Sequence, residues 1–254
     1  MGEIDTRFWY KVISNIERSD SSLLDTEVKD YFIGPRYSLV ETVTGKVGIA
    51  YSYAQEEKCK PAEGEYRIVR DFIPLLSSSC IIERSLAQAA VNSIGQLKLS
   101  QECSKLKTDP LHYVLSNRNP GTVIFIGAVK KIPGIYRDMG WKVYMLDRMQ
   151  EDKNILPDYY AYKLLPKADI VYVTGAAFSR PDIDMILDRS INARIIAEIG
   201  PSLSIPPSYL TGTGLTHLET SIIMDAKNTI RLVKLGFGYH SMKNLLTHVS
   251  CRVP

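Results

Sequence analysis

One stretch, residues 168–184, limits what this chain can fold into more than any other. It contains the apolar run Ile170–Val173, which is short, partly β-branched and followed by Thr-Gly. Such a run is typical of a central parallel strand that helices cover on both faces. Ser179 stands three residues before Asp182, a capping-box spacing that predicts the start of a helix. Open α/β sheets bind ligands where such a strand ends and its helix begins.

The same order of strand and helix repeats through the second half of the chain. The expected strands cover residues 122–126, 141–146, 169–173, 194–199 and 215–223. The expected helices cover residues 132–139, 182–189 and 225–235, and residues 152–165 are expected to be irregular with one helical turn. Because strand–helix–strand crossovers are almost always right-handed, this order predicts a Rossmann-like, doubly wound parallel sheet.

The first half of the chain has a different pattern, which predicts a small α+β domain. An amphipathic helix at 4–18 is followed by strands at 28–33, 37–44 and 47–53, a charged flap at 54–65, a short helix at 71–76 and a helix at 81–94 that Gly95 ends. A short helix is expected at 108–115, and the pattern changes near 108–120. We therefore expect an α/β protein with domains at 1–110 and 111–254.

Composition excludes several classes of protein. The net charge of +3 is too small to indicate a nucleic-acid partner, and no apolar run approaches the roughly 18 residues of a membrane span. The N-terminus lacks the basic-then-apolar layout of a signal peptide, so a cytoplasmic location is expected. The four cysteines, at 59, 80, 103 and 251, form no C-x-x-C pair, and buried free thiols are favoured over disulfides.

Polar and small residues gather where the predicted strands end, which marks one edge of the sheet as the candidate site. These residues are Gly127, Asp147, Thr174, Gly175, Gly200, Pro201 and Ser202. Asp147 follows Gly127 by about 20 residues, the spacing at which dinucleotide folds hold an acid for the ribose, although it would equally serve as a loop cap. The G-x-G-x-x-G fingerprint is absent, because Lys130, Lys131 and Pro133 stand in its place.

Two further groups of residues are candidate ligand contacts. Arg180 is suited to a carboxylate or phosphate, and an ion pair with Asp182 or Asp184 is an equal alternative. His217 and Glu219 would share one face of a strand, but an isolated His-x-Glu is more typical of polar edge residues than of a metal site. No pattern of a catalytic nucleophile is present.

The chain resembles the uncharacterised "putative heavy-metal chelation" family. The resemblance rests on Ala168–Gly175, Asp182–Leu187 and Ile199–Ser202, with a looser match at Gly45–Ala50 and Leu86–Asn92. It implies an enolase N-terminal-like domain, a Rossmann-like domain, a cleft between them and a homodimer, with a transition-metal ion as the implied cofactor. The positions that it carries over are Asn92, Gly127, Pro133, Asp147, Thr174, Gly175, Asp184, Gly200, Pro201 and Ser202.

One turn departs from the family pattern. The family usually has hydroxyl residues and an Asn after its Thr-Gly, whereas this chain has Ala176, Ala177 and, at the Asn position, Arg180. The change favours a different or more anionic ligand and weakens a metal site, because arginine is no metal ligand. Asn92 would be costly to bury without hydrogen bonds, so it either points into the cleft, which the resemblance favours, or caps the neighbouring hairpin.

Three functions are compatible with these features. The first is binding of a small ligand, a metal ion or a metal complex, in the interdomain cleft, with Arg180 among the contacts. The second is an enzyme that uses a nucleoside-containing cofactor, and Asp147 is the reason to consider it. The third is a non-catalytic interaction protein whose cleft has lost its ligand.

Overall fold

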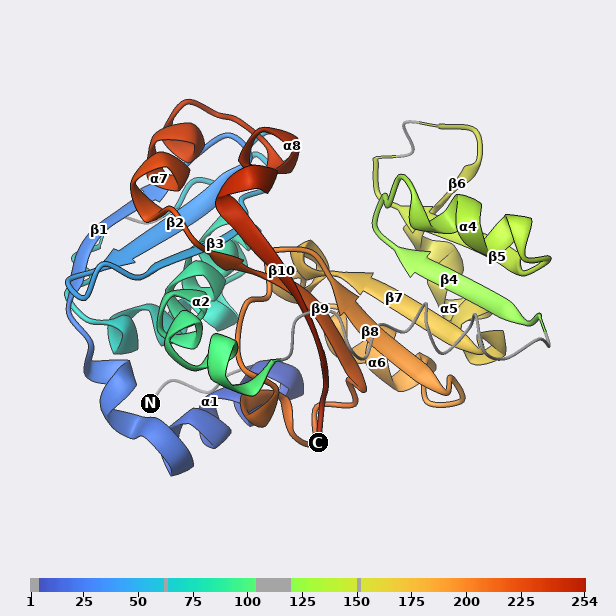
Figure 1. Ribbon diagram of the computed structural model, residues 1–254, viewed down its shortest axis with the longest axis horizontal. Coiled ribbons are helices and arrows are strands. Elements are labelled where there is room, and N and C mark those ends of the chain that lie inside the picture. The colour runs from blue at the N-terminus through green and yellow to red at the C-terminus, as the bar shows by residue number, and fades with distance from the viewer. Residues whose placement is uncertain (1–4, 62–63, 104–119, 150–151) are drawn as a thin grey trace.

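The computed structural model describes residues 5–61, 64–103, 120–149 and 152–254, and it contains two β-sheets (Figure 1). The first half forms α1 (Arg7–Asp20), β1 (Val28–Ile33), β2 (Tyr37–Thr42), β3 (Val47–Tyr51) and α2 (Ile81–Glu102), with 3₁₀ helices at Ser21–Asp25 and Val69–Ser77. Strands β1, β2 and β3 form a three-stranded antiparallel sheet in that order. The predicted α+β beginning is therefore confirmed.

The second half forms a seven-stranded sheet. Its strands are β4 (Thr122–Ile126), β5 (Lys142–Asp147), β6 (Ile155–Pro157), β7 (Ile170–Thr174), β8 (Ile195–Ile199), β9 (His217–Ile223) and β10 (Leu246–Arg252). Their spatial order is β6-β5-β4-β7-β8-β9-β10, and all neighbours are parallel except β9 and β10. The first six strands in this order match the Rossmann arrangement, whose ligand-binding switch point lies between β4 and β7.

Helices cover both faces of the large sheet, which confirms the doubly wound prediction. The helices of this half are α4 (Ile132–Asp138), α5 (Ala161–Leu164), α6 (Ile183–Arg189), α7 (Ala226–Lys234) and α8 (Tyr239–Met242). On one face, α4 packs its Tyr136 against Phe125 and Tyr172. On the other, α5 and α6 share one core with α1 and α2 from the first half.

The small sheet lies between helices that are far apart in the sequence. Helix α2 packs on one of its faces, and α7 and α8 lie over the other, as the red helices beside the blue strands show in Figure 1. Val233 and Met242 reach the side chains of Leu39 and Ile49 there. The last part of the chain thus completes the packing of the first.

Helix α2 differs from its prediction, because it continues through Gly95 to Glu102. A Cβ on Gly95 would lie 2.7 Å from the Ser204 carbonyl oxygen and from a methyl group of Ile205. Close packing against this segment, rather than a helix end, therefore accounts for the glycine. The helix expected at 108–115 lies outside the described residues.

The expectation of free thiols is wrong. Cys59 pairs with Cys80 and Cys103 pairs with Cys251, with Cα–Cα distances of 5.6 Å and 5.2 Å. The partners are 21 and 148 residues apart, so only the fold brings them together. The second disulfide joins the end of α2 to β10 and thereby ties the two halves of the chain.

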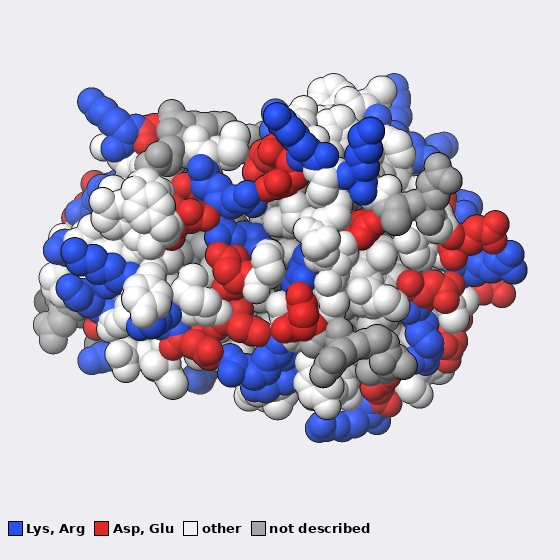
Figure 2. Space-filling view, turned by 180° about the vertical axis from the view of Figure 1, so that it is seen from behind, with Lys and Arg blue, Asp and Glu red and all other residues white. Residues whose placement is uncertain are grey.

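The surface carries charges of both signs. On the face in Figure 2, Lys and Arg side chains lie among Asp and Glu side chains over the whole outline. None of the described helices combines the length and the apolar character that crossing a membrane requires.

Candidate functional site in the interdomain cleft

The ends of β4 and β7 pack closely against each other at the switch point of the large sheet. Gly127 follows β4 with φ of +98°, and its N–H donates to the Leu146 carbonyl oxygen at 2.7 Å. A Cβ at this position would lie 2.3 Å from Thr174 Oγ1 at the end of β7. Glycine is therefore required for both the backbone conformation and the contact with Thr174.

A row of polar side chains on α2 faces the same edge of the sheet. Arg84, Gln88, Asn92 and Gln96 recur at every fourth position, so they share one side of the helix, and each is at most 5% exposed. We call these four residues the polar stripe. Buried polar groups are costly unless they are hydrogen-bonded, so their partners identify their role.

The middle of the polar stripe binds the segments that follow β7 and β8. Gln88 Nε2 donates to the Gly175 carbonyl oxygen at 2.8 Å and also to that of Ser202. Asn92 Nδ2 donates to the carbonyl oxygens of Ile49 at 2.8 Å and Ser202 at 2.7 Å, and Asn92 Oδ1 accepts from the Ser204 N–H. Three predicted ligand contacts, Asn92, Gly175 and Ser202, are thus joined in one hydrogen-bond network.

The ends of the polar stripe extend this network. Arg84 Nε donates to the Ser179 carbonyl oxygen at 2.9 Å, and Gln96 Oε1 accepts from the Ile223 N–H at 2.9 Å. Ser179 Oγ donates to Gln88 Oε1, so Ser179 is part of the network and does not cap α6 as predicted. Helix α2 therefore covers the carboxyl ends of β7, β8 and β9, and the edge near β5 is where a ligand has room.

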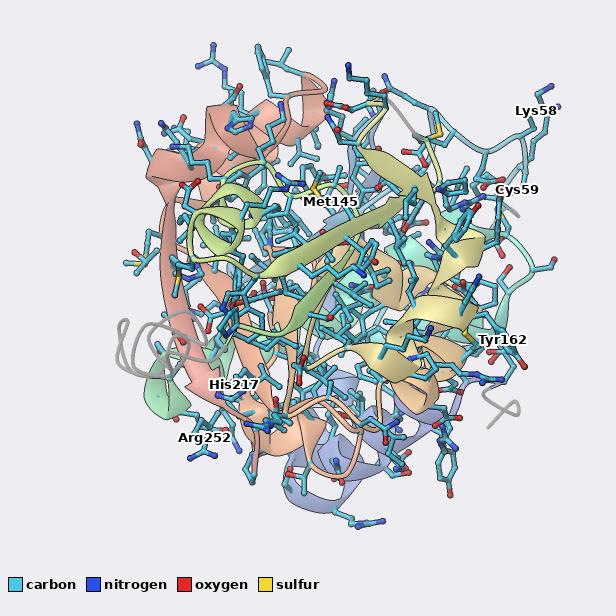
Figure 3. All side chains as sticks on the ribbon, turned by 90° about the vertical axis from the view of Figure 1, so that its right-hand side faces the viewer. Lys58, Cys59, Met145, Tyr162, His217 and Arg252 are labelled. Carbon is cyan, nitrogen blue, oxygen red and sulfur yellow. A yellow bond between two sulfur atoms is a disulfide. The ribbon has the colours of Figure 1, made fainter. Side chains whose placement is uncertain are left out.

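A cleft of about 380 Å³ lies at that edge, between the start of α2 and the large sheet. Its lining residues are Glu57, Cys59, Ser79, Ile81, Arg148, Arg180, Pro181 and Asp182. Both halves of the chain contribute residues to this cleft. Cys59 is labelled at the right-hand edge of the molecule in Figure 3.

The two arginines of the cleft are held differently. Arg180 is paired with both Asp158, at 2.8 Å, and Asp182, and its side chain is only 12% exposed. Burial by itself would lower the pKa of Arg180. The hydrogen bond and the charge of Asp182 outweigh this effect and raise the pKa above its usual value, so the guanidinium stays charged. Arg148 is paired with Glu57 and is 37% exposed.

A tyrosine fixes the turn after β7. Tyr53 has φ of +58°, a left-handed conformation that is unusual for a bulky residue. Its hydroxyl donates to the Ala176 carbonyl oxygen at 2.8 Å, and burial raises its pKa although Arg180 lies nearby. Ala176, in the turn that departs from the family pattern, is thus held from the first half of the chain.

The other predicted residues lie at the sheet edge with backbone partners. Asp147 Oδ2 accepts from the Ala128 N–H and Oδ1 from the Met149 N–H, both at 2.9 Å, which is the geometry of a loop cap. Gly200 has φ of +114°, and the Pro201 carbonyl oxygen accepts from Ser204 Oγ.

The two remaining positions that the resemblance carried over lie at the ends of helices. Pro133 is buried in the first turn of α4, and Asp184 accepts from the N–H groups of Arg7 and Phe8 at the start of α1. Of all the predicted residues, Arg180 is the one that lines the cleft.

Sequence reasoning missed Arg84, Gln88 and Gln96, as well as Glu57 and Arg148. The first three share a detectable signal with Asn92, because polar residues at every fourth position form one continuous side of a helix. Glu57 and Arg148 have no such signal, since they are 91 residues apart and meet only in the fold.

The donor groups of the described residues do not fit a resident metal ion. Nowhere in these ranges do three His, Cys, Asp or Glu side chains come together, and every cysteine is in a disulfide. Glu219 accepts from Ser250 Oγ and is paired with His248, so it serves the β9–β10 pair. A heavy metal usually requires several such ligands at once.

Comparison with known proteins defines the family. A family model described as "Putative heavy-metal chelation" (DUF364) matches residues 109–251, more than half of the chain. The chain belongs to this family. A second model with the same description (DUF4213) matches residues 16–95 of this DUF364 protein.

Relatives of this DUF364 protein match it over nearly their whole length, two of them in fold. An uncharacterized protein of Methanocaldococcus jannaschii is 25% identical over 241 residues, which cover 89% of this chain and 92% of that protein. A DUF364 protein of unknown function from Pyrococcus horikoshii superposes with a TM-score of 0.81 at 24% identity and covers 99% and 100% of the two chains. Another, from Desulfitobacterium hafniense, has a TM-score of 0.76 at 18% identity and covers 96% and 98%.

Proposed function

We propose that this DUF364 protein binds a small organic ligand in the cleft between α2 and the large sheet. The observation that carries the proposal is the cleft itself, which lies at the ligand-binding edge of a Rossmann-like sheet and contains Arg148 and Arg180. Because Arg180 is held rigidly by two carboxylates, its remaining N–H groups are preorganised to orient a polar group.

The family description is compatible with this site if the metal arrives as a complex. The described residues offer no group of three metal-ligating side chains, so a bare ion would lack ligands. A metal held by an organic chelator brings its own ligands, and the carboxylates of the chelator would bind arginine. We therefore propose a metal–chelator complex, or the chelator alone, as the ligand.

A nucleoside-containing cofactor is the second candidate, and the Rossmann order of the strands favours it. Against it, both oxygens of Asp147 already accept backbone N–H groups, and the turn after Gly127 lacks the usual glycines. An enzyme of this class would need Asp147 to exchange a backbone bond for the ribose hydroxyl.

The test is a set of thermal unfolding curves with citrate, Ni²⁺–citrate, free Ni²⁺, NAD and S-adenosylmethionine. We expect citrate or its nickel complex to raise the melting temperature, and Arg180→Gln to abolish this shift. Arg67→Gln is the matched control, because Arg67 forms an ion pair outside the cleft and is 83% exposed. The proposal would be contradicted if neither citrate nor Ni²⁺–citrate changed the melting temperature. It would also be contradicted if the shift survived in Arg180→Gln.

A shift with NAD or S-adenosylmethionine alone would favour the second candidate instead.

The homodimer and the cytoplasmic location are further proposals about this protein. Sedimentation of the purified protein tests the first, and fractionation of cells tests the second.

A further inference from the structure

Of the charged side chains that line the cleft, Glu57 is the one that a ligand can replace most easily. It lies in the first part of the predicted flap, residues 54–60, and its Oε1 accepts a hydrogen bond from Nη2 of Arg148, which also lines the cleft. The two side chains are 28% and 37% exposed, whereas Arg180 is 12% exposed and has two partners. Arg148 therefore has the weaker hold on its carboxylate.

The flap is fixed on both sides of Glu57. Before it, the N–H groups of Glu56 and Glu57 donate to the Tyr53 carbonyl oxygen at 2.9 Å and 3.0 Å. After it, Cys59 is bound to Cys80 at the start of α2. Figure 3 shows Lys58 extending away from the molecule next to Cys59. The Glu57 side chain can therefore leave Arg148 by rotation, without displacement of the flap.

We propose that the Glu57 carboxylate occupies the place of an anionic group of the ligand, and that a carboxylate or phosphate of the ligand replaces it on Arg148. The inference rests on the proposed function and adds the contact that the ligand must replace on entry. Arg148 and Arg180 line the same cleft, so a ligand with two anionic groups would contact both.

The cost of this exchange is small. Exposed ion pairs are worth little, since water and salt compete for both partners. When Glu57 leaves, its carboxylate returns to water, and Arg148 keeps an anionic partner throughout. In the unbound cleft Glu57 keeps Arg148 paired, and an incoming ligand has to replace only this weakly bound carboxylate.

The experiment is calorimetric titration of citrate into the wild type, Glu57→Gln and Arg148→Gln. Glu57→Gln removes the competing charge but keeps the shape of the side chain, so we expect citrate to bind about two- to sixfold more tightly. Arg148→Gln is expected to weaken binding. Glu65→Gln is the control, because Glu65 forms the same kind of pair with Arg67 away from the cleft and should leave citrate affinity unchanged.

Unchanged or weaker binding of citrate by Glu57→Gln would overturn this inference, as would tighter binding that persists when Arg148→Gln is added. The proposed function fails by a different result. If Arg180→Gln leaves the citrate affinity of the wild type unchanged, the ligand does not bind in the cleft. If Arg180→Gln weakens binding and Glu57→Gln has no effect, the cleft is the site and the exchange at Arg148 is wrong.

Discussion

Glu198→Gln should make the stability of this protein much less dependent on pH. Glu198 lies on β8 with 0% exposure, and neither of its carboxylate oxygens has a hydrogen-bond partner among the described residues. Its Oε1 lies 2.7 Å from the position that a Cβ on Gly175 would take, so it is next to the turn that Gln88 binds. Burial, and secondarily the charge of Glu219, raise its pKa well above 4.5.

The sign of the effect follows from the direction of this shift. The folded protein holds a proton on Glu198 that the unfolded chain releases above pH about 4.5, so the stabilisation is complete below that pH and is lost as the pH rises through the folded pKa. Between the two pKa values the loss is about 1.4 kcal/mol for each pH unit. For a chain of this size it lowers the melting temperature by about 3–6 °C per pH unit.

The assay is thermal unfolding of the wild type and Glu198→Gln at half-unit steps from pH 4.5 to 8. The variant is expected to gain on the wild type as the pH rises from 4.5 and to stop gaining once the pH passes the folded pKa of Glu198, whatever constant offset the buried amide adds. Glu65→Gln serves as control, since Glu65 is exposed and should follow the wild type. A constant difference between wild type and Glu198→Gln across this range would refute the reasoning, because it would mean that Glu198 releases its proton as readily in the folded state.

Three other changes test the packing around the site. Gly127→Ala should cost about 1–3 kcal/mol more than Gly140→Ala in urea unfolding, because both glycines have positive φ but a Cβ on Gly140 meets nothing closer than 4.0 Å. Asn92→Leu should cost about 3 kcal/mol or more by the same method, since it strands backbone groups that Asn92 satisfies. Replacing both cysteines of the Cys103–Cys251 disulfide by serines should cost about 4–5 kcal/mol, and the same change at Cys59–Cys80 about 3 kcal/mol. The first disulfide costs more because it closes a loop of 148 residues, whereas the second closes one of 21. Equal losses of stability would contradict this account.

Much of the fold follows from the sequence because strong local patterns specify it. The apolar runs of β4, β7 and β8 predicted central parallel strands within one or two residues. The helix predicted at 225–235 is α7, and Asp225 caps it because its Oδ1 accepts from the Asn228 N–H. In each case the signal and the structure lie within a few residues of one another.

The errors arise where distant packing decides the structure. Strand β6 has only three residues and ends in a proline, so no alternation distinguishes it from a loop. Strand β10 was not expected because its residues are recognisable as a strand only when they pair with β9. Gly95 looked like a helix end because its reason, the approach of Ile205, lies 110 residues further along the chain.

The sequence predicted a site at the edge of the sheet where the cleft lies, but of the predicted site residues Arg180 alone lines that cleft. Parallel strands place their carboxyl ends at one edge, and this geometry predicts that edge of the sheet from β4, β5 and β7 alone. The partner of each polar group depended on where α2 lies, and no local pattern contains that information. Asn92 and Arg180 were among the predicted ligand contacts and remain so as proposals, whereas Glu57 and Arg148 come together only in the fold.

A crystal structure of the protein purified without added ligand, and then soaked in citrate, tests the central claim most directly. The account predicts density for a small molecule in the cleft, in contact with Arg180 and Arg148, with the Glu57 side chain turned away. Density for citrate elsewhere on the surface, together with a cleft that keeps the Glu57–Arg148 pair, would contradict it.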